Sequence, residues 1–135
     1  MGGTTSLVRI PVYLSYPDNI DVDKLSKLRE KINGMNGNIL EHDQNNTEDN
    51  IIKSNIILYC ITKDSIKNYK QAIDFNVATD QKKNILFIFM NKDYGHNTHP
   101  ELLKVFPIDK CAIYFDDAYL DATIFKIQSA ICNGI

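Results

Sequence analysis

Residues 54–62 read SNIILYCIT, and this stretch decides the fold. Its six central residues, 56–61, form an unbroken apolar or aromatic run with polar residues on both sides. Such a run is typical of a strand that is buried on both faces of a parallel sheet. A second run of the same kind, ILFIFM, follows at 85–90. The segment between the two runs, 65–81, has helical spacing, so the three pieces together predict one βαβ unit.

The rest of the chain extends this unit in both directions. Three further strands are expected at 8–14, 38–42 and 111–115, and further helices at 21–32 and 118–131. Right-handed crossovers between parallel strands would give an open sheet with helices on both faces. The sequence therefore predicts a single flavodoxin-like α/β domain over residues 1–135, with a mostly parallel five-stranded sheet and an N-terminal tail, residues 1–7.

The helix between the two apolar runs has a predicted inner face. Ile66, Tyr69, Ile73 and Val77 recur at three- and four-residue spacing, which is the pattern of an amphipathic helix. We expect these four side chains to pack against the sheet.

Composition narrows the class of protein. The chain has 135 residues, 44% of them hydrophobic and 24% charged, which suits one globular domain. Its net charge of -2 gives no reason to expect a nucleic-acid partner or an anionic membrane surface. There is no apolar stretch of bilayer length and no secretory signal pattern. Cys60, Cys111 and Cys132 are odd in number and far apart, which favours a reducing, cytoplasmic location.

The N-terminus carries one targeting pattern. Residues 1–6, MGGTTS, match the N-myristoylation motif, with Gly2 as the acceptor and Ser6 at the favoured hydroxyl position. A single acyl chain gives reversible attachment to a membrane. Membrane association is therefore expected only if Gly2 is acylated.

Polar residues follow the predicted strands at the edge where parallel α/β sheets bind their ligands. That crevice lies beyond the carboxyl ends of the strands. Residues 15–17, 42–43, 62–63 and 91–92 would lie there. We expect the functional site at this edge.

Read in order, four segments resemble a TIR domain (Toll/interleukin receptor type). They are VYLSY at 12–16, NILEHD at 38–43, IKSNIILYCIT at 52–62 and KNILFI at 83–88. The resemblance covers residues 8 to about 90, and the remainder by the order of elements. It implies the flavodoxin-like fold that the hydrophobic pattern also predicts.

The resemblance implies two activities. TIR domains associate with one another and with other TIR proteins in signalling, so the first hypothesis is a module that self-associates or binds a partner in defence or stress signalling. Some also cleave NAD at the nicotinamide–ribose bond, so the second hypothesis is an NAD glycohydrolase or ADP-ribosyl cyclase. NAD would then be the substrate, and no cofactor is required.

The second activity assigns roles to particular residues. Enzymatic members place a Glu on the helix after the central strand, four residues before a small Ala, and its carboxylate holds the ribose hydroxyls. Here that position is Asp74, counted back from Ala78. Ser15, Tyr16 and Asp43 would contact the nucleotide at the sheet edge.

Each of these residues also has a structural interpretation. Asp74 would be an exposed helix residue that forms ion pairs with Lys67 and Lys70. The Ser-Tyr pair that ends the first strand would be a turn residue and a partly buried aromatic. Asp43 would cap the turn that follows its strand, which is the interpretation we favour.

Other sites find less support in the sequence. His96 and His99, with Glu101, do not form a complete set of zinc ligands, and no metal site is expected. Neither GxGxxG nor GxxxxGK[ST] occurs, so a conventional dinucleotide or phosphate-binding loop is absent. A third hypothesis is a receiver-like or nucleotide-binding flavodoxin-like domain, although Ser15 stands where a receiver would carry an acid.

Overall fold

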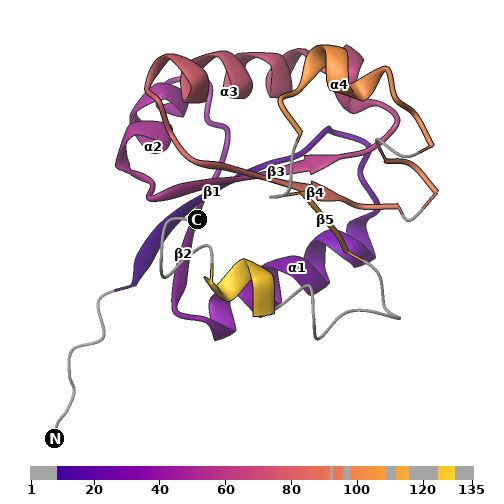
Figure 1. Ribbon diagram of the computed structural model, residues 1–135. Coiled ribbons are helices and arrows are strands. Elements are labelled where there is room, and N and C mark those ends of the chain that lie inside the picture. The colour runs from indigo at the N-terminus through magenta and orange to yellow at the C-terminus, as the bar shows by residue number, and fades with distance from the viewer. Residues whose placement is uncertain (1–8, 92, 96–97, 109–111, 116–124, 130–135) are drawn as a thin grey trace, which may run out of the picture.

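A five-stranded, all-parallel sheet forms the centre of the molecule, in the order β2-β1-β3-β4-β5 (Figure 1). The computed structural model describes residues 9–91, 93–95, 98–108, 112–115 and 125–129. This arrangement confirms the flavodoxin-like α/β fold. The strands are β1 Ile10–Ser15, β2 Gly37–Leu40, β3 Ile56–Ile61, β4 Ile85–Phe89 and β5 Ile113–Tyr114.

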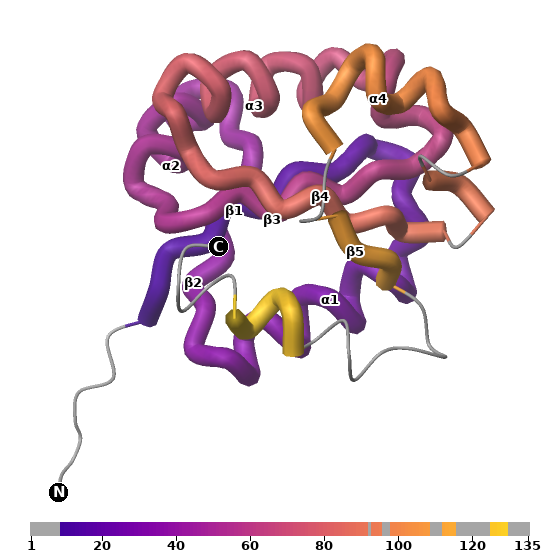
Figure 2. Tube along the Cα trace, viewed as in Figure 1, coloured from indigo at the N-terminus to yellow at the C-terminus, as the bar shows by residue number. Residues whose placement is uncertain are grey.

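Helices cover both faces of the sheet (Figures 1 and 2). On one face lie α1 and a helical segment at 125–129, and on the other lie α2, α3 and α4. The helices are α1 Val22–Gly34, α2 Thr47–Lys53, α3 Tyr69–Asp80 and α4 Leu102–Val105. A sheet with parallel strands needs this double cover because both of its faces are apolar. In the part of the chain that the structure describes, no helix has the length and apolar character needed to cross a bilayer.

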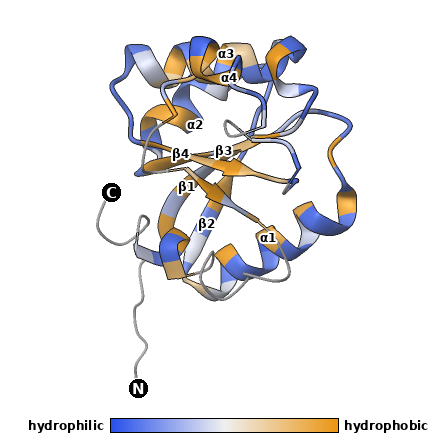
Figure 3. Ribbon diagram, turned by 45° about the vertical axis from the view of Figure 1, so that its right-hand side comes forward, coloured by the Kyte–Doolittle hydropathy of each residue, from blue (hydrophilic) through white to orange (hydrophobic). Residues whose placement is uncertain are grey.

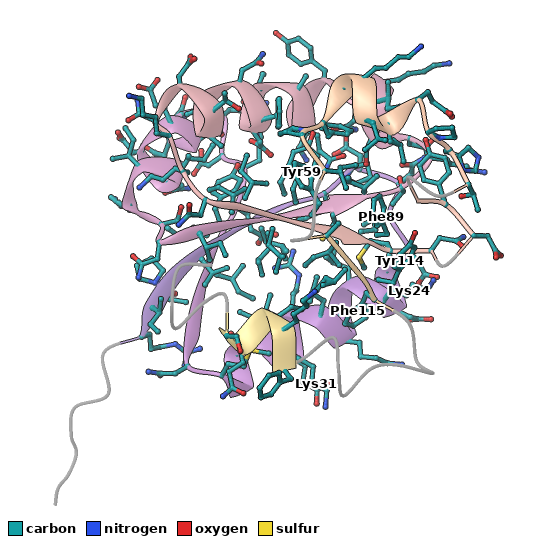
Figure 4. All side chains as sticks on the ribbon, in the orientation of Figure 1. Lys24, Lys31, Tyr59, Phe89, Tyr114 and Phe115 are labelled. Atoms are coloured by element: carbon teal, nitrogen blue, oxygen red, sulfur yellow. The ribbon has the colours of Figure 1, made fainter. Side chains whose placement is uncertain are left out.

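The central strand β3 is buried along its whole length, as its sequence predicts. Leu58 and Cys60 pack in the core on the α1 side, whereas Ile57 and Tyr59 pack on the α3 side. Figure 3 shows the continuous apolar colour of the inner strands beside the mixed colours of the helices. Figure 4 shows Tyr59 on the α3 side of the sheet and Phe115 on the α1 side.

Strand β1 lies between β2 and β3 and alternates between the two cores. Val12 and Leu14 pack on the α1 side, and Tyr13 packs on the α3 side. Ser15 follows Tyr13 by two residues, so both side chains leave the same face of the strand. Pro11, which cannot donate a ladder hydrogen bond, lies at the start of β1, as expected.

Helix α1 follows the predicted pattern. The Asp21 carboxylate caps it by accepting hydrogen bonds from the backbone amides of Asp23 and Lys24. The helix buries Leu25 and Ile32 against the sheet, together with the leucine between them.

The segment between β3 and β4 contains two helical elements, where one helix over 65–81 was expected. A short 3₁₀ turn, η2 Ser65–Lys67, comes first, and α3 begins after Asn68. The Asn68 Oδ1 caps α3 by accepting a hydrogen bond from the backbone amide of Gln71 at 2.9 Å. Asn68 is therefore a helix start signal inside an apparently continuous pattern.

The predicted inner face of this helical segment is wrong in part, since Val77 is partly buried and packs against the core but two of the other predicted residues are exposed. Tyr69 is 78% exposed and Ile66 is 37% exposed, so neither packs against the sheet. The buried positions are Gln71, Asp74 and Ala78. The helix therefore presents two polar side chains to the sheet, and their contacts define the candidate site.

Several predictions lie outside the described residues. They concern the tail at 1–7 with Gly2, the cysteines Cys111 and Cys132, and His96 of the weak metal pattern. Of the helix expected at 118–131, residues 125–129 are described, and they are helical.

Candidate functional site

Asp74 faces the sheet and is 1% exposed. The Tyr13 hydroxyl donates a hydrogen bond of 2.7 Å to its Oδ1, and the Ser15 hydroxyl donates one of 2.8 Å to its Oδ2. Tyr13 and Ser15 reach the same carboxylate because they leave β1 on the same face. Both oxygens of Asp74 therefore already have a hydroxyl partner.

The alternative interpretation of Asp74 as an exposed helix residue is wrong. The Lys70 ammonium pairs instead with Asp18, at 2.7 Å. It also lies 5.8 Å from the centre of the Tyr16 ring. Asp74 is thus a buried polar group of the interface between β1 and α3.

The electrostatics of Tyr13 suit its role as a donor. Burial raises the pKa of the phenol, and the neighbouring Asp74 carboxylate raises it further. The phenol consequently keeps its proton at any physiological pH. Each oxygen of the buried Asp74 carboxylate therefore has at least one hydrogen-bond donor inside the protein.

A histidine from the loop after β2 approaches the same carboxylate. The His42 Nδ1 lies 3.4 Å from the Asp74 Oδ1 and 3.2 Å from the Thr47 Oγ1. The His42 side chain is 20% exposed, compared with 2% for the Asp74 side chain. The β2–α2 loop is therefore connected to α3 through an imidazole.

Asp43, a predicted nucleotide contact, has a local role. Its side chain is exposed, and its Oδ1 accepts a hydrogen bond of 3.1 Å from the backbone amide of Asn45. Its backbone amide donates to the Thr47 Oγ1 at 2.9 Å. This is the geometry of a residue that caps a turn, in agreement with the interpretation favoured from the sequence.

Tyr16 lies beside the core on the α1 side of the sheet, away from the Asp74 cluster. Its hydroxyl donates to the Glu41 carboxylate at 2.5 Å and accepts from the Arg29 guanidinium at 2.9 Å. Arg29 and Glu41 also form an ion pair. Burial raises the pKa of Tyr16 to about 12, with a further contribution from its hydrogen bond to Glu41. Tyr16 therefore serves a partly buried ion-pair cluster.

The second buried polar residue of α3, Gln71, ties the helix to β3. The Gln71 Nε2 donates a hydrogen bond of 2.8 Å to the backbone carbonyl of Cys60. The backbone carbonyl of Gln71 accepts one of 3.1 Å from the Tyr59 hydroxyl. Its Oε1 has no hydrogen-bond partner among the residues that the structure describes. Gln71 and Asp74 thus fasten α3 to β3 and β1 respectively.

A pocket of about 390 Å³ lies at the carboxyl edge of the sheet, and we call it the edge pocket. Its wall combines the start of α1 with the segments that follow β3 and β4. The lining residues are Asn19, Ile20, Asp21, Lys24, Thr62, Lys63, Asp64, Met90, Asn91, Asp93 and Tyr94. Figure 4 shows Lys24 on α1 near this edge.

The predicted edge residues divide between two places. Thr62, Lys63 and Asn91 line the edge pocket, whereas Lys92 lies outside the described residues. Asp74 does not line the pocket, and neither do the three predicted nucleotide contacts. The Asp74 carboxylate and the edge pocket therefore lie at different places in the molecule.

Of the predicted site residues, the structure brings together only Ser15 and Asp74. Tyr16 and Asp43 serve other contacts. Sequence reasoning missed Tyr13, and although it expected His42 at the carboxyl edge of the sheet, it did not expect the contact of His42 with Asp74. The signal for Tyr13 was its two-residue spacing from Ser15, which places both side chains on one face of the strand.

No group of three or more His, Cys, Asp or Glu side chains within the described ranges is arranged to hold a metal ion. Comparison of the sequence with protein-family models and with curated proteins gave no match.

Proposed function

We propose that this chain is a TIR-like signalling module that acts by association with a second copy of itself. Three features support the proposal: the flavodoxin-like strand order, the TIR-like order of sequence segments, and the hydrogen bonds that Asp74 accepts from Tyr13 and Ser15. The proposed setting is defence or stress signalling in the cytoplasm, with membrane attachment if Gly2 is acylated. Other TIR proteins are the alternative partners.

The observation that carries this proposal is that the Asp74 carboxylate is buried and hydrogen-bonded within the protein. A carboxylate that binds ribose must offer acceptor oxygens to the substrate hydroxyls. Here Tyr13 and Ser15 donate to both oxygens, and the residue is 1% exposed. The edge pocket, where a substrate would find room, does not reach Asp74. Of the two activities implied by the resemblance, association is therefore the better supported.

Apolar side chains on the outer side of the α3 layer support association. Tyr69 is 78% exposed, Leu103 is 50% exposed and Val105 is 44% exposed. The helices α3 and α4, which carry them, lie side by side in Figures 1 and 3, and Phe75 of α3 contacts Phe106 after α4, with ring centres 5.5 Å apart. Large apolar groups that gather on one layer are typical of protein–protein contact surfaces.

Light scattering of the full chain across a range of protein concentrations tests the proposal. The average mass should rise with concentration, and Tyr69→Glu should suppress the rise because a charge would enter the contact. Val22→Glu is the matched control, since Val22 is 71% exposed but lies on α1, on the opposite face of the sheet. A strict monomer at high concentration, or equal effects of the two variants, would contradict the proposal.

The alternative is NAD cleavage, and one observation favours it. Ser15 ends β1 at the carboxyl edge and contacts Asp74, so two predicted site residues do meet where this fold class binds ligands. Catalysis would require Asp74, which is 1% exposed, to become accessible to the substrate. Nicotinamide release from NAD would reveal that activity.

A further inference from the structure

The edge pocket offers a binding site that the proposed function does not use. It lies where the segments after β3 and β4 meet the start of α1, beyond the carboxyl ends of the strands. This is the position at which open α/β sheets bind ligands. Its volume of about 390 Å³ is within the range of small-molecule sites.

Several polar groups of the pocket are already engaged. The Asp21 Oδ1 accepts from two backbone amides of α1, and the Lys24 ammonium donates to the Met90 carbonyl at 2.7 Å. The Asn19 side-chain amide donates to the Asp64 Oδ2 at 3.0 Å. These bonds fix the shape of the wall and leave it ordered before a ligand arrives.

Two charged side chains on the rim are available. Among the residues that the structure describes, neither the Lys63 ammonium nor the Asp93 carboxylate forms a hydrogen bond or an ion pair. Asp93 is exposed, and its backbone amide donates a hydrogen bond of 2.8 Å to the Asn91 Oδ1. The Asp93 carboxylate therefore lines the pocket without a hydrogen-bond donor from the described part of the chain.

The charge of the lining disfavours an anionic ligand. Three Asp and two Lys side chains line the pocket, so its formal charge is -3 + 2 = -1. The amides at the start of α1, which would otherwise attract a phosphate, are capped by Asp21. Among the described lining residues, a phosphate group would meet two ammonium groups, Lys24 and Lys63, but also three carboxylates.

The remaining wall suits a ring that has an apolar face. Ile20 and Met90 are buried core residues that also line the pocket, which gives it an apolar floor. The Tyr94 ring borders it and is supported by His99, with ring centres 4.3 Å apart. An aromatic side chain and an apolar floor together can hold the faces of a ring, while carboxylates accept hydrogen bonds from its hydroxyls.

We propose that the edge pocket binds a neutral ring compound with vicinal hydroxyls, the chemistry shared by a ribonucleoside and a free sugar. The Asp93 carboxylate accepts hydrogen bonds from the two hydroxyls, and the ring lies between Tyr94 and the Ile20–Met90 floor. Binding does not involve Asp74, so it goes beyond the association proposed above and is independent of it.

NMR titration of the full, isotope-labelled chain tests this proposal with three probes: adenosine, 2′-deoxyadenosine and methyl β-D-ribofuranoside. Adenosine should shift the backbone amide signals of Lys63, Asp93 and Asn19 but not that of Ser15. Deoxyadenosine, which lacks the diol, should bind about tenfold more weakly. If the riboside binds as tightly as adenosine, a sugar is the favoured source of the diol; if adenosine binds more tightly, a nucleoside is favoured.

Asp93→Asn removes the charge of the proposed acceptor and keeps its shape. It should weaken adenosine binding about tenfold, whereas Asp49→Asn, an exposed carboxylate on α2, should have no effect. The proposal is overturned if neither diol compound shifts the pocket signals at about 10 mM. It is also overturned if deoxyadenosine binds as tightly as adenosine, if AMP binds more tightly than adenosine, or if Asp93→Asn, with an unchanged spectrum, binds like the wild type.

Discussion

The hydroxyl of Ser15 and the carboxylate of Asp74, 59 residues apart in the chain, are joined by a buried hydrogen bond of 2.8 Å. Together with the bond from Tyr13, it fastens the carboxyl end of β1 to the middle of α3. Asp74, for which the TIR resemblance implied a catalytic role, thus links two elements of the core.

Tyr13→Phe and Ser15→Ala should each lower the free energy of unfolding by about 1–3 kcal/mol, because each leaves one oxygen of a buried carboxylate without its donor. Urea unfolding measures the loss. Asp49→Asn, on the exposed side of α2, is the control and should stay within about 0.5 kcal/mol of the wild type.

A double-mutant cycle separates the link from general packing. Tyr13→Phe combined with Asp74→Ala should cost less than the sum of the two single changes, by about 0.5–3 kcal/mol, because the two residues share one interaction. Strict additivity would mean that the hydrogen bond contributes nothing to stability.

Two glycines near the end of α1 should respond in opposite directions to alanine. A Cβ on Gly37 would lie 2.6 Å from the Ile32 Cγ2 and 3.0 Å from the Ile32 carbonyl oxygen, so Gly37→Ala should destabilise the fold by about 1–3 kcal/mol. A Cβ on Gly34 meets nothing within 4 Å, so Gly34→Ala, at the last residue of α1, should raise the free energy of unfolding by about 0.4–1 kcal/mol. Thermal or urea unfolding of the pair checks both signs, and a stabilising Gly37→Ala would refute the packing described for β2.

The Glu41–Arg29 pair should make stability depend on acid pH. Burial opposes ionisation of Glu41, but the hydrogen bonds from Arg29 and Tyr16 outweigh it and hold the pKa of Glu41 below its usual value. The resulting stability is present above the pKa of unfolded Glu and is lost as the pH falls through the lower folded pKa. Because both side chains are about one-third exposed, the effect should be at most about 1 kcal/mol.

Urea unfolding at a series of pH values between about 7 and 3 measures that contribution. The difference in stability between wild type and Glu41→Gln should shrink as the pH falls. A difference that stays constant over this range would show that the Glu41 charge makes no contribution.

Cys60 should be unreactive in the folded protein. It is fully buried on β3, and burial raises the pKa of its thiol to about 12, so the thiolate is scarce at neutral pH. Treatment with iodoacetamide at pH 8, followed by peptide mass mapping, should leave the Cys60 peptide unmodified until urea is added. Modification of the native protein at Cys60 would contradict the burial of β3.

The hydrophobic pattern predicted the sheet well because its inner strands are buried on both faces. Residues 56–61 and 85–89 leave few alternatives to a parallel sheet, and the observed strands match them closely. For α3 the same reasoning failed in part, although Val77 does pack against the core. It chose Tyr69 for the inner face, whereas the helix buries Gln71 and Asp74.

That failure has a physical cause. A polar side chain can be buried when the fold supplies hydrogen-bond partners, and those partners come from distant strands. Tyr13 and Ser15 satisfy Asp74, and the Cys60 carbonyl accepts from Gln71. Periodicity within one segment does not reveal such partners. The edge pocket also escaped prediction in part, since Thr62 and Asn91 were expected there but Tyr94 was not.

The most direct measurement is nicotinamide release from NAD by the full chain at high concentration and with a crowding agent, compared with Asp74→Asn and with Asp49→Asn. If Asp74 is a structural carboxylate, the wild type releases no nicotinamide above the rate in buffer under any of these conditions. Release by the wild type and by Asp49→Asn that Asp74→Asn abolishes while its circular dichroism spectrum stays native would contradict this and establish Asp74 as catalytic.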